Sequence, residues 1–130
     1  MTGTAVHSRE PELIIGTGID IVEVQRLRRS IEKWGDSFAN RIFTADELAY
    51  CAAKVSKFQN LAGRFAAKEA IFKAVGNQRI GFKDICICND KNGRPFCRVL
   101  NDKARGITIH ISISHVKNYA VASAIATKKA

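Results

Sequence analysis

The sequence predicts one domain that contains both helices and strands, and three observations predict it. Residues 61–75 repeat apolar and small side chains at helical spacing, and a glycine follows them at position 76. Residues 107–115 instead alternate strictly between isoleucine and a polar residue, which is typical of a strand with one buried face. A chain of 130 residues, 46% of them hydrophobic, can bury a core of its own. We place this domain at residues 13–130 and expect the polar residues 1–12 to form a flexible extension.

A first strand is predicted at residues 13–22. Gly16 and Gly18 interrupt its apolar run, and glycines inside a strand pattern indicate a bend or a close approach to another backbone. The spacing is not GxGxxG, so a dinucleotide site is not supported. Asp20 alternates with two isoleucines and therefore points to the opposite side of the strand from them. Asp20 could cap the following helix or belong to a site, and the pattern leaves both open.

Two helices are predicted before the central one. The first spans residues 23–34 and carries an apolar stripe that we expect to face the core, made of Val24, Leu27, Ile31 and Trp34. Its outer face is basic, with Arg26, Arg28, Arg29 and Lys33. Such a face is usually only solvated, but it could also dock an acidic partner. The second helix spans residues 44–54 and begins with a T-x-x-E capping box formed by Thr44 and Glu47.

The central helix is small or apolar on nearly all sides and should therefore be buried. It nevertheless carries four charged residues, Arg64, Lys68, Glu69 and Lys73. Buried charges need partners, because desolvating an unpaired ion is costly. One interpretation is a site for a metal ion and a phosphate. The other is structural, because Glu69 and Lys73 have the i,i+4 order that stabilises any helix, and a lysine can extend its stem along an apolar surface.

Strands are predicted after the central helix. Residues 84–88 and 96–100 flank Asn92-Gly93, which is a strong hairpin signal. The alternating strand 107–115 places a row of polar side chains on one face, namely Thr108, His110, Ser112 and Ser114, and His115 stands where the alternation ends. This row could be the exposed face of a sheet or a phosphate-binding floor. The last strand is predicted at residues 119–126.

The composition limits the partner and the compartment. Lys and Arg number 21 against 12 Asp and Glu, and the net charge of +9 favours an anionic partner, such as nucleic acid, a phosphorylated ligand or an acidic protein. No apolar run reaches the ~18 residues of a membrane span, and residues 1–12 lack the apolar core of a secretory signal. The four cysteines are therefore expected to be reduced thiols in a cytoplasmic protein. The spacing Cys86-x-Cys88 does not match a zinc knuckle.

Three motifs far apart in the chain then occur in one order: GTGIDIVE at 16–23, LAGRFAAKEA at 61–70 and ISISH at 111–115. Together they resemble the holo-acyl-carrier-protein synthases, small bacterial 4′-phosphopantetheinyl transferases, over residues 14–125. The resemblance implies an α+β fold, the 4′-phosphopantetheinyl transferase fold, whose antiparallel sheet packs on a long central helix. It also implies a homotrimer with active sites between subunits. The implied reaction, which supports fatty acid biosynthesis, is the magnesium-dependent transfer of the phosphopantetheine arm of coenzyme A to a serine of apo acyl carrier protein, releasing adenosine 3′,5′-bisphosphate.

The resemblance also implies roles for single residues. The Mg²⁺ ligands fall on Asp20 and Glu69, Glu69 is the preferred general base, and Lys73 would lie near the pyrophosphate. Contacts to the phosphates of coenzyme A are expected from Arg64, His115, Ser114 and Lys57. In the family, basic residues just before the central helix contribute to the 3′-phosphate site; this segment carries fewer of them, so no contact is expected there beyond Lys54 or Lys57. Arg26, with Arg29 on the same helix, is expected to dock the acidic carrier protein.

Two other functions compete with this one. Net charge favours a small basic nucleic-acid-binding protein, but the sequence has no RNP-like aromatic motif, and most of its aromatic residues lie on the predicted core stripes. A subunit that binds coenzyme A without turnover is the other alternative. We therefore expect neither nucleic acid nor a membrane among the partners.

Overall fold

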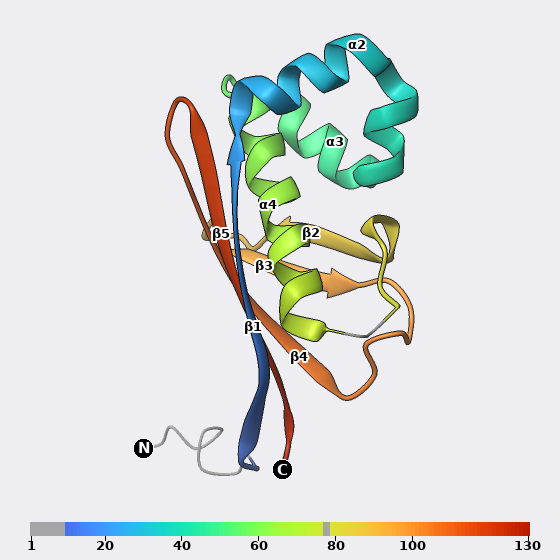
Figure 1. Cartoon of the computed structure of the whole chain (residues 1–130), viewed down its shortest axis with the longest axis vertical. Helices are drawn as coiled ribbons and strands as arrows, with labels where there is room; N and C mark the ends of the chain where they lie inside the picture. Colours follow the sequence, from blue (N-terminus) through green and yellow to red (C-terminus); the bar gives the residue numbers. More distant parts are fainter. Residues whose placement is uncertain (1–9, 77–78) are drawn as a thin grey trace.

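The computed structural model describes residues 10–76 and 79–130, so most of the predicted extension at residues 1–12 lies outside the described residues. Figure 1 shows the elements in chain order. They are β1 (Glu12–Glu23), α2 (Val24–Ile42), α3 (Ala45–Ala52), α4 (Lys57–Val75), the short 3₁₀ helix η1 (Phe82–Asp84), β2 (Ile85–Asn89), β3 (Pro95–Val99), β4 (Ile107–His115) and β5 (Tyr119–Lys129).

Two antiparallel sheets are arranged around the long helix α4. The larger sheet has the strand order β1-β5-β4, and β2 and β3 form a separate hairpin. Helix α4 runs along one face of the larger sheet, and α2 and α3 gather around its first turns (Figure 1). The predicted α+β fold, with an antiparallel sheet on a long central helix, is confirmed.

The first helix differs from its prediction. It was expected to end at Trp34, but helical structure continues to Ile42 across a kink at Gly35, whose φ is 67°. Val24 and Leu27 are buried as predicted, whereas Trp34 is 60% exposed, so its place on the core stripe was wrong. Because the chain changes direction at Gly35, the residue before the kink no longer faces the core. Phe38, from the segment after the kink, packs against that core instead.

The glycines of β1 serve a close approach to α4. A Cβ atom at Gly16 would lie 1.9 Å from the Ala74 carbonyl oxygen, and one at Gly18 would lie 2.0 Å from the Ala70 carbonyl oxygen. Strand and helix backbones are therefore in direct contact, which only glycine allows on the strand. On the helix, the fully or almost fully buried alanines Ala66, Ala67, Ala70 and Ala74 keep the surface flat. The close backbone approach predicted for the two glycines is confirmed.

A buried ion pair ties the helices together. Lys68 Nζ lies 2.7 Å from Glu47 Oε1, and both side chains are fully buried. The same ammonium group donates to the carbonyl oxygens of Ile42 and Phe82, each at 2.8 Å. Glu47 also accepts from the backbone N–H of Thr44 in the predicted capping box, and from that of Ile87 at 2.6 Å. Burial lowers the pKa of Lys68, and the charge of Glu47 opposes that shift.

The cysteines are free thiols in hydrophobic surroundings. Cys51 and Cys86 are buried, and Cys88 and Cys97 are half-buried in the hairpin. Burial raises the pKa of Cys51 to about 11 and that of Cys97 to about 12, so these two thiols stay protonated at neutral pH. Within residues 10–76 and 79–130, no helix is both long and apolar enough to cross a bilayer.

The contact between β1 and α4 can be tested with Gly18→Ala. The added methyl group would meet the Ala70 carbonyl oxygen, which is backbone and cannot rotate away, so we expect a loss of about 1–3 kcal/mol in the free energy of unfolding. Urea unfolding followed by circular dichroism measures this loss. Gly81→Ala is the matched control, because its nearest new contact would be the Asp84 carboxylate at 3.6 Å. Equal stability of the two variants would show that the close approach does not constrain the fold.

Candidate active site

A cavity of about 460 Å³ opens where the end of β1 meets the start of α2 and the middle of α4. We call it the carboxylate pocket, because Asp20 and Glu69 both line it. Its other lining residues come from the same elements and from β5 and include one more acidic and one basic residue; they are Ile21, Val22, Glu23, Arg26, Leu27, Ser30, Phe38, Phe65 and Tyr119. Two acidic residues far apart in sequence therefore meet at one site.

The two carboxylates meet because of the contact between β1 and α4. Gly18 packs on Ala70. Gly18 is two residues before Asp20 on the strand, and Ala70 is one residue after Glu69 on the helix. Strand alternation then turns Asp20 toward the helix, while Ile19 and Ile21 point to the other face. The alternative that Asp20 caps the next helix is wrong, since the N-cap of α2 is Glu23, which makes no side-chain cap bond.

Lys73 completes this group of charges. Its Nζ lies 3.3 Å from Asp20 Oδ1 and donates to the carbonyl oxygen of Ile19 at 2.8 Å. Partial burial raises the pKa of Glu69, the negative charge of Asp20 raises it further, and Lys73 acts in the opposite direction. Three carboxylates line the pocket, those of Asp20, Glu23 and Glu69, against the cations Arg26 on its wall and Lys73 beside Asp20, which leaves a net negative charge that favours a bound cation.

The donor set fits Mg²⁺. This ion prefers oxygen ligands and is commonly held by one or two carboxylates, with phosphate oxygens and waters in the other positions. The part of the chain that the structure describes contains no group of three or more His, Cys, Asp or Glu residues that could hold a metal. Asp20 and Glu69 therefore suit a metal that is shared with a phosphorylated ligand better than one enclosed by protein alone.

A second, smaller cavity of about 220 Å³ lies between α4, the β2–β3 hairpin and the end of β4. We call it the anion pocket, because Arg64 and His115 both line it. Arg64 is only 4% exposed, yet its Nε has no hydrogen-bond partner among the described residues. Gly63 lets β4 approach, since a Cβ there would lie 2.9 Å from Ile113 Cγ2. A buried cation with a free donor and an imidazole beside it fits an anionic group.

The two pockets lie on different sides of α4. Arg64 and Glu69 are five residues apart, which separates them by about 140° around the helix axis and about 7.5 Å along it. No residue lines both cavities. One copy of the chain therefore presents two partial sites that face different directions.

The other residues predicted to contact phosphate do not line the anion pocket. Ser114 is exposed, belongs to the polar row on the face of β4 turned away from α4, and does not line the anion pocket. Lys57 lies in a separate groove beside Phe58, with its Nζ 5.3 Å from that ring. Lys54 Nζ lies 4.7 Å from the ring of Tyr50, which lines the anion pocket, but Lys54 itself does not line it. No sequence motif indicated Tyr50 or Asn89, which also lines this pocket.

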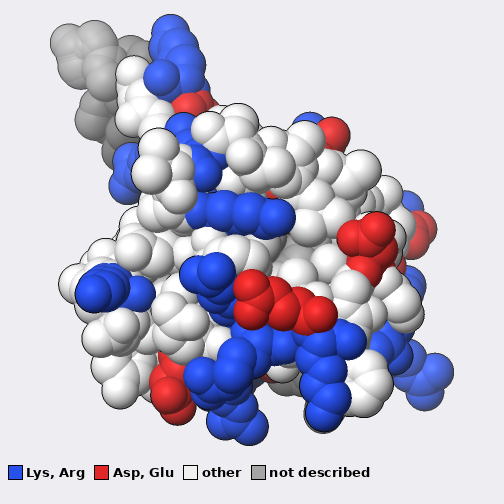
Figure 2. Space-filling model, turned by 90° about the horizontal axis from the view of Figure 1, so that it is seen from above, with Lys and Arg blue, Asp and Glu red and all other residues white. Residues whose placement is uncertain are grey.

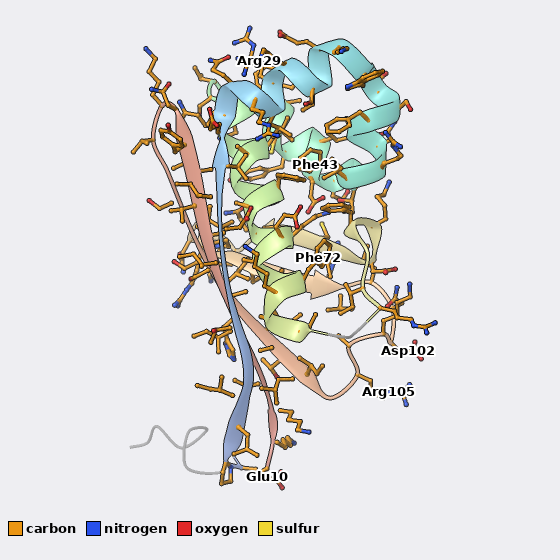
Figure 3. All side chains as sticks on the ribbon, viewed as in Figure 1. Glu10, Arg29, Phe43, Phe72, Asp102 and Arg105 are labelled. Atoms are coloured by element: carbon orange, nitrogen blue, oxygen red, sulfur yellow. The ribbon has the colours of Figure 1, made fainter. Side chains whose placement is uncertain are left out.

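The basic face of α2 borders the carboxylate pocket. Arg26 lines that pocket, and Arg29 projects from the upper side of the helix (Figure 3). Arg28 is partly neutralised by Glu32 at 3.1 Å. Seen from above, this end of the molecule shows many Lys and Arg side chains and few acidic ones (Figure 2). An acidic macromolecule could therefore approach the carboxylate pocket across α2.

Comparison with known proteins agrees with the resemblance of the motifs. The 4′-phosphopantetheinyl transferase superfamily matches residues 16–124. A holo-[acyl-carrier-protein] synthase of Halothermothrix orenii is 44% identical over 118 residues, which cover 85% of this chain and 94% of that protein. One from Koribacter versatilis is 43% identical over 123 residues, covering 87% and 98%. The crystal structure of a holo-(acyl-carrier-protein) synthase from Bacillus anthracis str. Ames, in complex with CoA (3′,5′-ADP), has a TM-score of 0.76 at 36% identity and covers 89% of this chain and 98% of that one.

Proposed function

Because this chain belongs to the holo-acyl-carrier-protein synthases of the 4′-phosphopantetheinyl transferase superfamily, we propose that it transfers the 4′-phosphopantetheine arm of coenzyme A to a serine of an apo acyl carrier protein. The observation that carries the proposal is the convergence of Asp20 and Glu69 in the carboxylate pocket, with Lys73 bound to Asp20 beside it. Adenosine 3′,5′-bisphosphate is the second product, and the holo carrier protein would serve fatty acid biosynthesis.

In the proposed reaction, the serine hydroxyl attacks the phosphorus of coenzyme A that bears the pantetheine arm. The bond from that phosphorus to the bridging oxygen breaks, and the bisphosphate leaves with this oxygen. Glu69 accepts the serine proton, directly or through a water molecule. Mg²⁺ on Asp20 and Glu69 would stabilise the negative charge on the pyrophosphate.

Lys73 is suited to the leaving group. Its ammonium group is held by Ile19 and Asp20 on β1, yet its side chain is 55% exposed and can contact a ligand. A positive charge at this position would stabilise the bisphosphate as it departs. The helix therefore supplies a base at Glu69 and a cation one turn later.

The anion pocket would bind the remaining phosphate of coenzyme A. Its volume of about 220 Å³ is below the range of about 300–1,000 Å³ for pockets that enclose a whole small molecule, so it suits a phosphate group better than a nucleotide. Since the two pockets face different directions on one copy, we propose that coenzyme A lies between two copies in a homotrimer. Large exposed isoleucines on the open face of the larger sheet, Ile19, Ile21 and Ile125, support such an association.

The deciding experiment combines the protein with coenzyme A, Mg²⁺ and an apo carrier protein, followed by intact mass spectrometry. We expect the carrier to gain the mass of one phosphopantetheine, and a chelator to abolish the gain. Glu69→Gln should reduce turnover by about 10²–10⁴-fold, because it removes a metal ligand and the base. Asp102→Asn is the control, since Asp102 is exposed in the loop between β3 and β4, away from α2 (Figure 3). Coenzyme A binding without a mass gain would mean a binding subunit, and normal turnover by Glu69→Gln would exclude this mechanism.

The docking role of α2 predicts a selective effect of Arg26→Glu. Reversing this charge should lower kcat/KM for the carrier protein by about 10-fold, because long-range attraction of an acidic partner is lost, and should leave the KM for coenzyme A unchanged. Initial rates at two ionic strengths should also show a weaker salt dependence. Arg105→Glu changes net charge equally but lies far from α2 (Figure 3). A higher KM for coenzyme A with an unchanged KM for the carrier protein would show that Arg26 serves coenzyme A binding and not docking of the carrier protein.

A composite site predicts complementation between two inactive variants. Glu69→Gln impairs the carboxylate pocket, and His115→Ala impairs the anion pocket. When the two variants are co-expressed in equal amounts, random trimers should regain about one quarter of wild-type sites, since an intact site needs Glu69 from one copy and His115 from another. Assays of the co-purified mixture, with sedimentation equilibrium for the trimer, test this. No regained activity, or a monomer at active concentrations, would mean that each copy holds a complete site.

A further inference from the structure

Two side chains outside every sequence motif hold Arg64 in place. Arg64 Nη2 donates to Asn89 Oδ1, and the guanidinium carbon lies 4.3 Å from the centroid of the Tyr50 ring. Asn89 is itself fixed, because its Nδ2 donates to the carbonyl oxygen of Gly93 at 2.9 Å. The guanidinium plane is therefore held by a hydrogen bond at its edge and an aromatic ring at its face.

This arrangement leaves Arg64 with unused binding capacity. A guanidinium group carries five N–H donors, and the buried Nε of Arg64 has no partner among the described residues. None of the described residues that line the anion pocket is acidic, and His115 lies in the same cavity. Lys54 Nζ also lies 4.7 Å from the Tyr50 ring centroid. Buried donors are normally satisfied, so the free Nε points to a ligand group that accepts hydrogen bonds.

We propose that Tyr50 and Asn89 are positioning residues that orient Arg64 and thereby set the selectivity of the protein for ligands with a 3′-phosphate. The inference rests on the proposed function. In that function the reacting pyrophosphate must lie beside Asp20 and Glu69, whereas Arg64 faces another side of α4. The only other phosphate of coenzyme A is the one at the 3′ position, so it is the group left for the anion pocket.

The positioning acts by preorganisation. An arginine that is free to rotate loses conformational freedom when it binds an anion, and this loss weakens binding. Tyr50 and Asn89 impose the bound orientation before the ligand arrives. Removing either side chain should therefore weaken the contact with the 3′-phosphate and leave contacts to the rest of the nucleotide as they were.

The test compares two ligands by isothermal titration calorimetry, adenosine 3′,5′-bisphosphate and adenosine 5′-monophosphate, which lacks the 3′-phosphate. For the wild type we expect tighter binding of the bisphosphate. For Tyr50→Leu and for Asn89→Ala we expect the ratio of the two affinities to fall by about 5- to 10-fold. Tyr50→Phe keeps the ring face and should restore the wild-type ratio.

Each outcome decides the proposal. If Tyr50 had a purely structural role, Tyr50→Leu would weaken the binding of both ligands equally and leave the ratio of their affinities unchanged, which would overturn the inference. A lower affinity ratio in Tyr50→Phe would overturn it as well. Equal binding of the two ligands by the wild type would show that the anion pocket does not take the 3′-phosphate. Asn89→Ala keeps the test valid if Tyr50→Leu does not fold. Because calorimetry needs no turnover, a selective protein that fails to modify the carrier would refute the proposed function and leave this inference standing.

Discussion

The contact between the backbones of β1 and α4 is the constraint on which the rest of the structure depends. Gly16 and Gly18 lie against the carbonyl oxygens of Ala74 and Ala70, with no room for a side chain on the strand. This contact fixes the height and the rotation of the helix relative to the sheet. The contact between Gly18 and Ala70 sets the positions of Asp20 on the strand and Glu69 on the helix. The packing that closes the core therefore also brings the two carboxylates together.

The charged residues of α4 from Arg64 onward serve different purposes because the helix turns about 100° per residue. Lys68 is fully bonded by Glu47 of α3 and by two carbonyl oxygens, one at the end of α2 and one in η1. Glu69, one residue later, lines the carboxylate pocket. Arg64 is as buried as a core residue but keeps an unsatisfied donor. Lys68 and Arg64 are both buried, but only Lys68 has partners for all its donors. The presence of bonding partners, and not burial, therefore distinguishes a charged residue with a structural role from one available to a ligand.

The larger sheet is packed on one face only. Alanines of β5 lie under α4, whereas Ile19, Ile21 and Ile125 are exposed on the opposite face. Such an apolar surface favours contact with other copies of the chain. The acidic partner would instead be attracted by the basic face of α2, in a chain whose net charge is +9. Association through this face and a ligand shared between the two pockets are consistent with each other, since both require more than one copy.

The sequence by itself determined the elements and much of the site. Periodicity and the turn glycines located every strand and the central helix, because side-chain spacing and positive φ are local properties, and strand alternation gave the direction of Asp20. The family motifs pointed to Asp20, Glu69, Arg64 and His115. The kink at Gly35, the exposure of Trp34 and the partner of Lys68 were missed. Only the tertiary structure decided which charged residues meet, and that Tyr50 and Asn89 hold Arg64. Those contacts join residues far apart in the chain, and no local pattern specifies them, because they depend on how α4 is rotated against its neighbours.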